Sequence, residues 1–471
     1  MSFILYESKV KNVPVPDTAK KREMECDNQV RTQQRDYLEE AEYLINVKEH
    51  VIAEINPEAS STYSATTILN YFQEKMISPY LRLLSLMSLR PLLTIQENSP
   101  LLEFVNIFYV TVLMLFMIFG YFLQYMSCFR RDRGFCYLIQ NPNIYEGVGV
   151  SEKYIQEKIC YGSTVFSFIL PGSLHLIAYL HAIYVMRSSD DDQISLLMER
   201  VILASSNLSN GFIVQKKLMK TLWVFISVSV VWILMSSISI ASMTNEGNID
   251  FKWIPESRSP TIDICLKVLL VATILWHDMI EGIIIANYCI QTQLLISYLF
   301  FLRERLLQYA VEPIKWMRDI EEFKKMLNYV NSEVATSVSI FTLVNISYAI
   351  SGILWLLKLD VIDKKTIPIL GISLMIILLW IFISTIPFVQ AIRLTNACEM
   401  LKDVGHKVRI QPFVHSGTPI AELDSVLLFT STLRIHAKLF SNIVTGSNLL
   451  FCLVITCIGI LVLGMCHYLA F

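Results

Sequence analysis

Charged residues are scarce in this chain of 471 residues. Asp, Glu, Lys and Arg make up 17% of it, against about 25% in a typical soluble domain. The hydrophobic share is 54% and the mean hydropathy is +0.49. A soluble core of ordinary size has no room for so many apolar residues, and these residues also occur in long runs. The formal net charge of −2 removes any bulk electrostatic argument for a nucleic-acid partner.

Motifs of enzymes and cofactor sites are missing as well. The sequence has no glycine-rich phosphate loop, no nucleophile elbow and no metal-spaced set of His and Glu, so we expect no catalytic residue, no metal site and no cofactor. The ten cysteines include no Cys-x-x-Cys pair. Cys128, Cys136 and Cys160 fall in one predicted loop, where one disulfide and free thiols are equally plausible. The polar N-terminal segment lacks the short apolar stretch of a signal peptide.

Seven apolar stretches are long enough to cross about 30 Å of hydrocarbon at about 1.5 Å per residue. This pattern predicts an all-α, polytopic membrane protein with seven transmembrane helices, placed in the plasma membrane. The stretches are residues 102–127, 162–186, 220–243, 265–291, 335–358, 367–392 and 447–471.

Lys and Arg between the predicted spans set the orientation. On the side of the N-terminus, the flanking segments carry 18 of these residues, whereas those on the other side carry nine. Arg130, Arg131 and Arg133, in the first loop of the second side, run against this bias. The two-to-one excess predicts the N-terminus in the cytoplasm and, after an odd number of spans, the C-terminus outside. G-protein-coupled receptors run the other way, and their Asp-Arg-Tyr and Asn-Pro-x-x-Tyr motifs are absent from the expected spans.

Segments between the spans are predicted to be helical on the cytoplasmic side, including residues 420–441 before the last span. We expect them to form a bundle that joins subunits. The predicted organisation is a cytosolic tail with a short helix at residues 1–60, an amphipathic segment at 61–101, spans one to four at 102–302, anchor helices at 303–334, spans five and six at 335–392, anchor helices with the first part of helix seven at 393–446, and the last transmembrane helix at 447–471.

Polar residues in the middle of the fourth predicted span are unusual for a membrane helix. His277 and Glu281 share one helical face, and Asp278 lies three residues before Glu281. Charged groups at that depth are costly unless they are paired or hydrated, so they either line a functional pocket or tie helices together. With aromatic residues of the outer halves, they suit a small, mostly apolar organic ligand. The candidate ligand-binding residues are Phe168, Trp232, Trp276, His277, Asp278 and Trp380.

The last predicted span carries polar and small residues on one helical face. Its members follow one another at helical spacing, which leaves the rest of the helix apolar. Such a stripe either packs against other helices or lines water, and a narrow apolar position near its outer end would close a water path by dewetting. The candidate pore-lining residues are Asn448, Cys452, Thr456, Gly459, Leu463 and His467.

Short motifs along the chain resemble those of the insect-type chemoreceptor superfamily, which contains the gustatory and odorant receptors and their gustatory-receptor-like relatives. Residues 78–84, Ser-Pro-Tyr-Leu-Arg-Leu-Leu, followed by Arg-Pro at 90–91, are similar to the family's opening segment. Residues 326–331, Met-Leu-Asn-Tyr-Val-Asn, are similar to its entry into the fifth span, and Ala-Cys-Glu-Met at 397–400 to its exit from the sixth. Leu-Phe at 428–429, before a helix starting near Gly446, is similar to its two-part seventh helix.

The resemblance implies a ligand-gated, non-selective cation channel with a small-molecule pocket in the outer half of the bundle. It implies a homo- or hetero-tetramer whose central pore is lined by the last helix, and a sensory role such as taste. The family's Thr-Tyr and Gln-Phe signature is replaced here by Thr456-Cys457 and Leu463-Gly464, which favours a divergent member. Two alternatives stay open, a proton-coupled transporter and a non-conducting structural or trafficking protein. Neither the ligand (tastant, odorant, light or peroxide) nor the ion selectivity follows from the sequence.

Overall fold

The computed structural model describes most of the chain from residue 74 onward. The described residues are 74, 78–92, 100–127, 129–131, 134–135, 165–188, 193–206, 211–246, 251, 260–308, 311–357, 367–410 and 419–469. The predicted tail with its short helix at residues 1–60, and the three loop cysteines Cys128, Cys136 and Cys160, lie outside them. All the contacts discussed below belong to the unit formed by residues 65–471.

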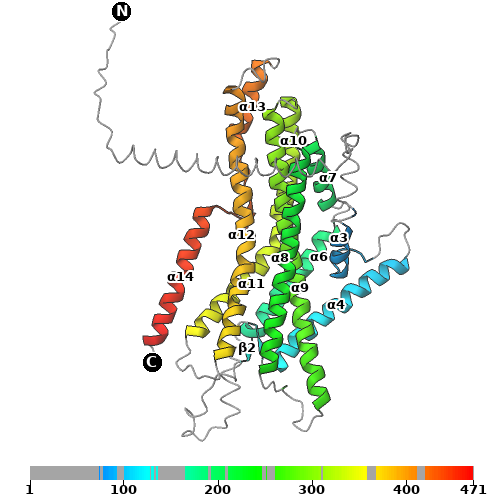
Figure 1. Cartoon of the computed structure of the whole chain (residues 1–471), viewed down its shortest axis with the longest axis vertical. Helices are drawn as coiled ribbons and strands as arrows, with labels where there is room; N and C mark the ends of the chain where they lie inside the picture. The colour runs from blue at the N-terminus through cyan, green and yellow to red at the C-terminus, as the bar shows by residue number, and fades with distance from the viewer. Residues whose placement is uncertain are drawn as a thin grey trace, which may run out of the picture. The chain divides into compact units, whose positions relative to one another are not determined.

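The described chain is a bundle of helices with two very short hairpins (Figure 1). The helices are α3 (Ser78–Leu86), α4 (Pro100–Met126), α6 (Leu170–Ser188), α7 (Gln193–Ser206), α8 (Gly211–Glu246), α9 (Pro260–Leu307), α10 (Pro313–Tyr329), α11 (Ala335–Leu357), α12 (Ile367–Ile410), α13 (Ile420–Thr432) and α14 (Gly446–Leu469). Single π-helical turns, η5 (Val165–Ile169) and η6 (Val330–Val334), lead into α6 and α11. The strands are β1 (Phe129–Arg130), β2 (Gly134–Phe135), β3 (Lys438–Leu439) and β4 (Asn442–Ile443), and they pair as two antiparallel hairpins.

Each predicted span corresponds to a helix: α4, α6, α8, α9, α11, α12 and α14. Among the described residues, five segments are long and apolar enough to cross a membrane: Leu101–Met126, Val214–Asn245, Pro260–Leu307, Pro313–Leu354 and Leu370–Ile410. These features make the chain a multi-pass membrane protein. Crossings by the shorter α6 and by α14 stay predictions, as does the orientation.

The long helix α9 forms the centre of the bundle. All side chains of residues 280–295 are buried, polar ones included, because neighbouring helices cover this stretch: α4, α7, α8, α10, α11 and α12. Figure 1 shows α8, α9 and α12 running side by side. At about 1.5 Å per residue its 48 residues are far longer than the 30 Å or so of a bilayer core. The helix therefore continues past residue 291, the predicted end of the fourth span, to Leu307.

The extended ends of α9 and α12 pack with α10 and α13 at one end of the bundle (Figure 1). The indole nitrogen of Trp316 on α10 donates a hydrogen bond of 2.9 Å to the carbonyl of Leu302, and its ring meets Phe429 on α13 edge-on. Arg305 and Asp319 form an ion pair of 3.6 Å beside them. These contacts explain why the segments predicted as anchor helices fold onto the spans.

The prediction of one helix over residues 420–441 is wrong beyond Thr432. Leu433 has an extended backbone, with φ −70° and ψ 117°, and the chain then forms the β3–β4 hairpin. Phe440 and Ser441 in its turn adopt positive φ values of 52° and 61°. Asn331 stabilises the hairpin by donating to the carbonyl of His436 at 3.0 Å and accepting from the Lys438 amide at 2.9 Å. Side chains distant in sequence thus end the helix, and the last helix starts anew at Gly446, close to the predicted start.

Substitution of Gly405 by alanine should destabilise the α12–α13 contact by about 1–3 kcal/mol, the usual cost of overpacking. A Cβ atom at Gly405 would clash with Oγ1 of Thr430 and lie 3.0 Å from the backbone Cα of Leu427. Gly371→Ala on the same helix is the matched control, because a Cβ there meets nothing within 4 Å. Thermal unfolding of the purified proteins in detergent compares the two; equal stabilities would contradict the packing described here.

Candidate functional site

The polar residues of the fourth predicted span are all buried inside the bundle. His277, Asp278 and Glu281 on α9 are 0%, 0% and 1% exposed. The helical period turns them toward different neighbours, so they contact three different helices rather than one shared space. The hydrogen-bond and ion-pair partners of each residue therefore have to be considered separately.

Asp278 is the centre of the most elaborate set of contacts. One carboxylate oxygen pairs with the guanidinium of Arg131, and the other accepts a hydrogen bond of 2.6 Å from the Ser236 hydroxyl on α8. Arg131 follows β1 and belongs to the turn of the β1–β2 hairpin, in which Arg130 pairs with Gly134. Figure 1 shows β2 at the end of the bundle opposite α10 and α13. The first-loop arginine is thus 6% exposed and buried among the helices.

Two tryptophans complete the surroundings of this ion pair. The guanidinium carbon of Arg131 lies 5.1 Å from the ring centroid of Trp380 on α12, within cation–π distance. Trp380 in turn meets Trp232 on α8 edge-on at 6.1 Å and Tyr348 on α11 at 5.4 Å. The Trp232 indole nitrogen donates to the carbonyl of Leu379 at 3.1 Å. Three predicted ligand-binding residues, Trp232, Asp278 and Trp380, are therefore brought together around Arg131.

The other predicted ligand-binding residues, Phe168, Trp276 and His277, contact α4 instead. His277 donates a hydrogen bond of 3.2 Å from Nε2 to the carbonyl of Met117, and its ring meets that of Tyr121 at a tilt of 36°, with 4.5 Å between the ring centroids. Trp276 meets Phe116 edge-on, and Phe168 meets Tyr125 edge-on. The structure therefore divides the predicted set into two groups, in which His277 and Asp278 have different hydrogen-bond partners.

Glu281 has a neutral partner. Its carboxylate accepts a hydrogen bond from the side-chain amide of Asn345 on α11, which is itself fully buried. Sequence reasoning missed Asn345 and, more seriously, Arg131. The sequence did contain a signal for Arg131. A buried aspartate at position 278 needs a cationic partner, and the first loop supplies three arginines.

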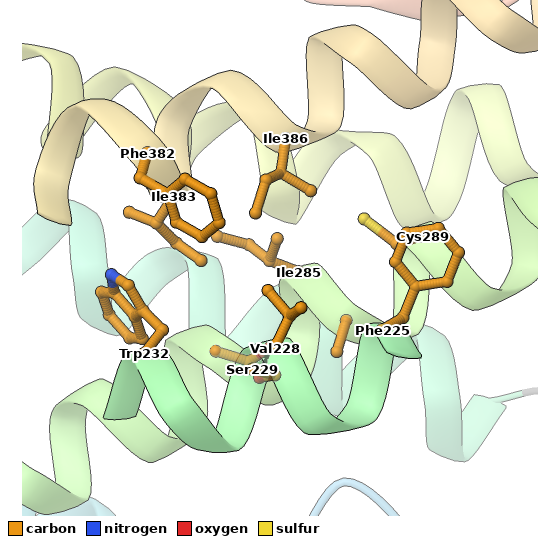
Figure 2. A pocket seen from close by; sticks show the side chains of 11 residues that line it. Phe225, Val228, Ser229, Trp232, Ile285, Cys289, Phe382, Ile383 and Ile386 are labelled. Atoms are coloured by element: carbon orange, nitrogen blue, oxygen red, sulfur yellow. Dashed lines mark hydrogen bonds between the residues drawn. The ribbon is translucent and has the colours of Figure 1, made fainter. Parts of the chain in front are cut away.

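A small cavity lies between α8, α9 and α12, and Trp232 is part of its lining. Its volume is about 20 Å³, enough for about one water molecule. Figure 2 shows Trp232, Val228 and Phe225 of α8 on one side and Phe382, Ile383 and Ile386 of α12 on the other. The polar Ser229 hydroxyl is engaged at 3.0 Å with the carbonyl of Gly282, so the lining offers mainly apolar surface. This cavity and the Arg131 site meet at the Trp232–Trp380 contact.

The last helix, α14, packs chiefly against α11 and leaves much of its surface exposed. Leu450, Phe451 and Leu461 are 64%, 66% and 65% exposed, and Figure 1 shows the helix beside the bundle. A groove of about 1020 Å³ separates α14 from α11 and α12.

The predicted pore-lining residues all fall on α14, which spans Gly446–Leu469. Asn448 and Thr456 line the groove, and a Cβ at Gly459 would meet nothing within 4 Å. The side chains of Cys452, Leu463 and His467 lie outside the described residues.

Comparison with known proteins identifies the fold. No protein-family model matches the sequence, and no curated protein matches it significantly. Solved structures do match, among them the insect olfactory receptor OR5 from Machilis hrabei and the same receptor in complex with eugenol. Each has a TM-score of 0.55 at 10% sequence identity, and each match covers 83% of this chain and 98% or 99% of the receptor. The chain thus has the insect chemoreceptor-type fold, as the motifs in the sequence predicted.

Proposed function

We propose that this protein is a gustatory-receptor-like chemoreceptor that acts as a ligand-gated, non-selective cation channel in the plasma membrane. In this proposal the chain crosses the membrane seven times with its N-terminus inside. Four copies, identical or related, surround a central pore lined by the polar face of α14. The anchor helices join the subunits on the cytoplasmic side.

The observation that carries this proposal is the position of α14. α14 packs chiefly on α11 and borders an open groove toward α11 and α12, which Asn448 and Thr456 line, so other helices have room beside it. Association of several copies around one axis would bring their α14 helices together and give the polar face a shared aqueous path. The likeness in fold to an olfactory receptor supports the same assignment.

The proposed ligand site is the region between α8, α9 and α12 around Trp232 and Trp380. An apolar cavity suits a small organic molecule, and its Trp232 contacts Trp380, which lies against Arg131. The Machilis receptor was solved with eugenol, a small aromatic compound, which supports a ligand of similar size here. The cavity of 20 Å³ is smaller than any such ligand, so binding requires the tryptophans or the Arg131 side chain to move.

Expression in cells lacking related receptors, with whole-cell recording during application of a panel of small organic compounds, tests the function. We expect a ligand-evoked current carried by monovalent cations. A proton-coupled transporter would instead give substrate-dependent proton flux, and a structural or trafficking protein would give no current.

Filling the cavity should weaken the response without unfolding the protein. Ala286 lines the cavity and is 7% exposed, so Ala286→Val adds volume where a ligand would bind. We expect about a tenfold loss of ligand potency, the usual effect of one or two misplaced methyl groups. Ala272→Val on the exposed face of the same helix is the control and should leave the potency unchanged. Equal dose–response curves for the two variants would contradict the site.

A further inference from the structure

We propose that Asp278, Ser236 and Trp380 form a binding site for a small organic cation, with a guanidinium or primary amine head, and that Arg131 is its tethered occupant. The inference deepens the proposed function, because it assigns a chemical class of ligand to the polar end of the same pocket. In this arrangement an external cation competes with the protein's own side chain.

The site has the features that recognise a flat cation. The Asp278 carboxylate accepts from Arg131 on one oxygen and from Ser236 at 2.6 Å on the other, which orients it. The Trp380 ring lies 5.1 Å from the guanidinium carbon and is 3% exposed. A carboxylate and an aromatic face around one buried position stabilise a guanidinium through charge, hydrogen bonds and cation–π attraction together.

The balance of charge in this region favours a cation. Asp278 and Glu281 are two carboxylates one helical turn apart on α9, and both are buried. Arg131 is the cation paired with Asp278, whereas the hydrogen bond to Glu281 comes from the neutral amide of Asn345. Asp278 therefore has one cationic partner, and a ligand that takes the place of that partner has to be a cation itself, because a neutral or anionic ligand would leave the buried carboxylate unpaired.

Arg131 is better suited to exchange than a residue of the bundle itself. It belongs to a hairpin of two-residue strands and not to a helix that packs along its length. Among the described residues, its Nε–H has no hydrogen-bond partner although the side chain is buried, so the guanidinium uses only part of its donor capacity. The amide oxygen of Asn345, which is buried beside Glu281, likewise has no hydrogen-bond partner within the described parts of the chain. A free cation with several N–H groups is able to donate to an acceptor that the tethered arginine leaves unused.

The neighbouring cavity sets the shape of the ligand. Trp232 lines it and also touches Trp380, so an apolar substituent on the cation has apolar space next to it. The chemical class that fits is therefore a guanidine or primary amine with a short hydrocarbon or aromatic group.

Chemical rescue of a variant without the arginine tests the site. We expect Arg131→Ala to be less stable than the wild type and to regain thermal stability, by about 2–4 °C, in millimolar methylguanidinium chloride. Methylurea, an uncharged analogue of the same shape, should have no effect. Methylguanidinium should stabilise the wild type less than Arg131→Ala, because there it has to displace Arg131, and neither compound should stabilise the Arg131→Ala/Asp278→Asn double variant. The yield of monodisperse protein solubilised with and without methylguanidinium gives the same comparison if the single variant folds poorly.

A second pair of variants tests the site without relying on chemical rescue of Arg131→Ala. Arg131→Lys and Arg131→Gln have similar length and differ in charge, so the lysine variant should be the more stable while Asp278 is present. The advantage should disappear in the Asp278→Asn background. Absence of any response to methylguanidinium, or equal stability of the lysine and glutamine variants, overturns the proposal. None of these measurements requires conduction, so they distinguish a failed cation site from a failed channel assignment. Phenethylguanidine applied during whole-cell recording tests in addition whether a cation of this class evokes a current.

Discussion

Asp278→Ala should destabilise the protein by about 3–5 kcal/mol, the cost of leaving a buried charge without its partner. Arg131 would stay buried beside the Trp380 ring with no carboxylate to offset its charge, and the Ser236 hydroxyl would lose its acceptor. Unfolding followed by SDS titration or by heating in detergent measures the loss.

The control for this prediction is another aspartate on the same helix. Asp263 pairs with Lys267 at 2.9 Å, but its side chain is 23% exposed, so Asp263→Ala should cost at most about 1 kcal/mol. A double variant, Arg131→Met with Asp278→Leu, removes both charges and should recover most of the stability lost in Asp278→Ala. Similar small losses for both single aspartate variants would show that the ion pair does not hold the hairpin in the bundle.

Gly459→Phe should abolish most of the current while leaving expression and assembly intact. Gly459 lies on the polar face of α14, and a side chain added there meets no atom of its own subunit within 4 Å, so the variant should fold. In the proposed tetramer four phenyl rings would narrow one level of the pore and raise the barrier to hydrated ions. A barrier higher by about 1.4 kcal/mol reduces conduction about tenfold.

The neighbouring position provides the control. Ile458 is 53% exposed and turned about 100° away from Gly459 around the helix, so Ile458→Phe should conduct nearly as the wild type does. Surface labelling verifies that both variants reach the membrane. Equal currents from the two variants would place the conduction path elsewhere.

Helices were the part of the structure that the sequence predicted best. Long apolar runs leave the backbone no alternative to helix in a bilayer, so the predicted span 335–358 differs by one residue from α11, Ala335–Leu357. The two hairpins were missed, because strands of two residues are too short to show any period. The end of α13 was missed since it depends on Asn331, which is distant in sequence.

The candidate site was predicted in part. Burial at mid-span singled out Asp278, and aromatic composition singled out Trp232 and Trp380, which the fold brings together. Arg131 was counted only as a loop charge opposing the orientation rule, because nothing local indicates that a hairpin 147 residues before Asp278 enters the bundle. His277 was grouped with Asp278 on sequence proximity, but adjacent residues of a helix point about 100° apart and so reach different neighbours.

The central claim, that α14 lines the pore of a ligand-gated cation channel, is tested most directly by purified protein in planar bilayers. We expect wild-type protein to give discrete cation currents that increase on addition of a small aromatic probe such as eugenol or phenethylamine. Gly459→Phe should suppress these currents and Ile458→Phe should preserve them. Silent bilayers containing monodisperse wild-type protein that stays monomeric, or currents unaffected by Gly459→Phe, would contradict the account.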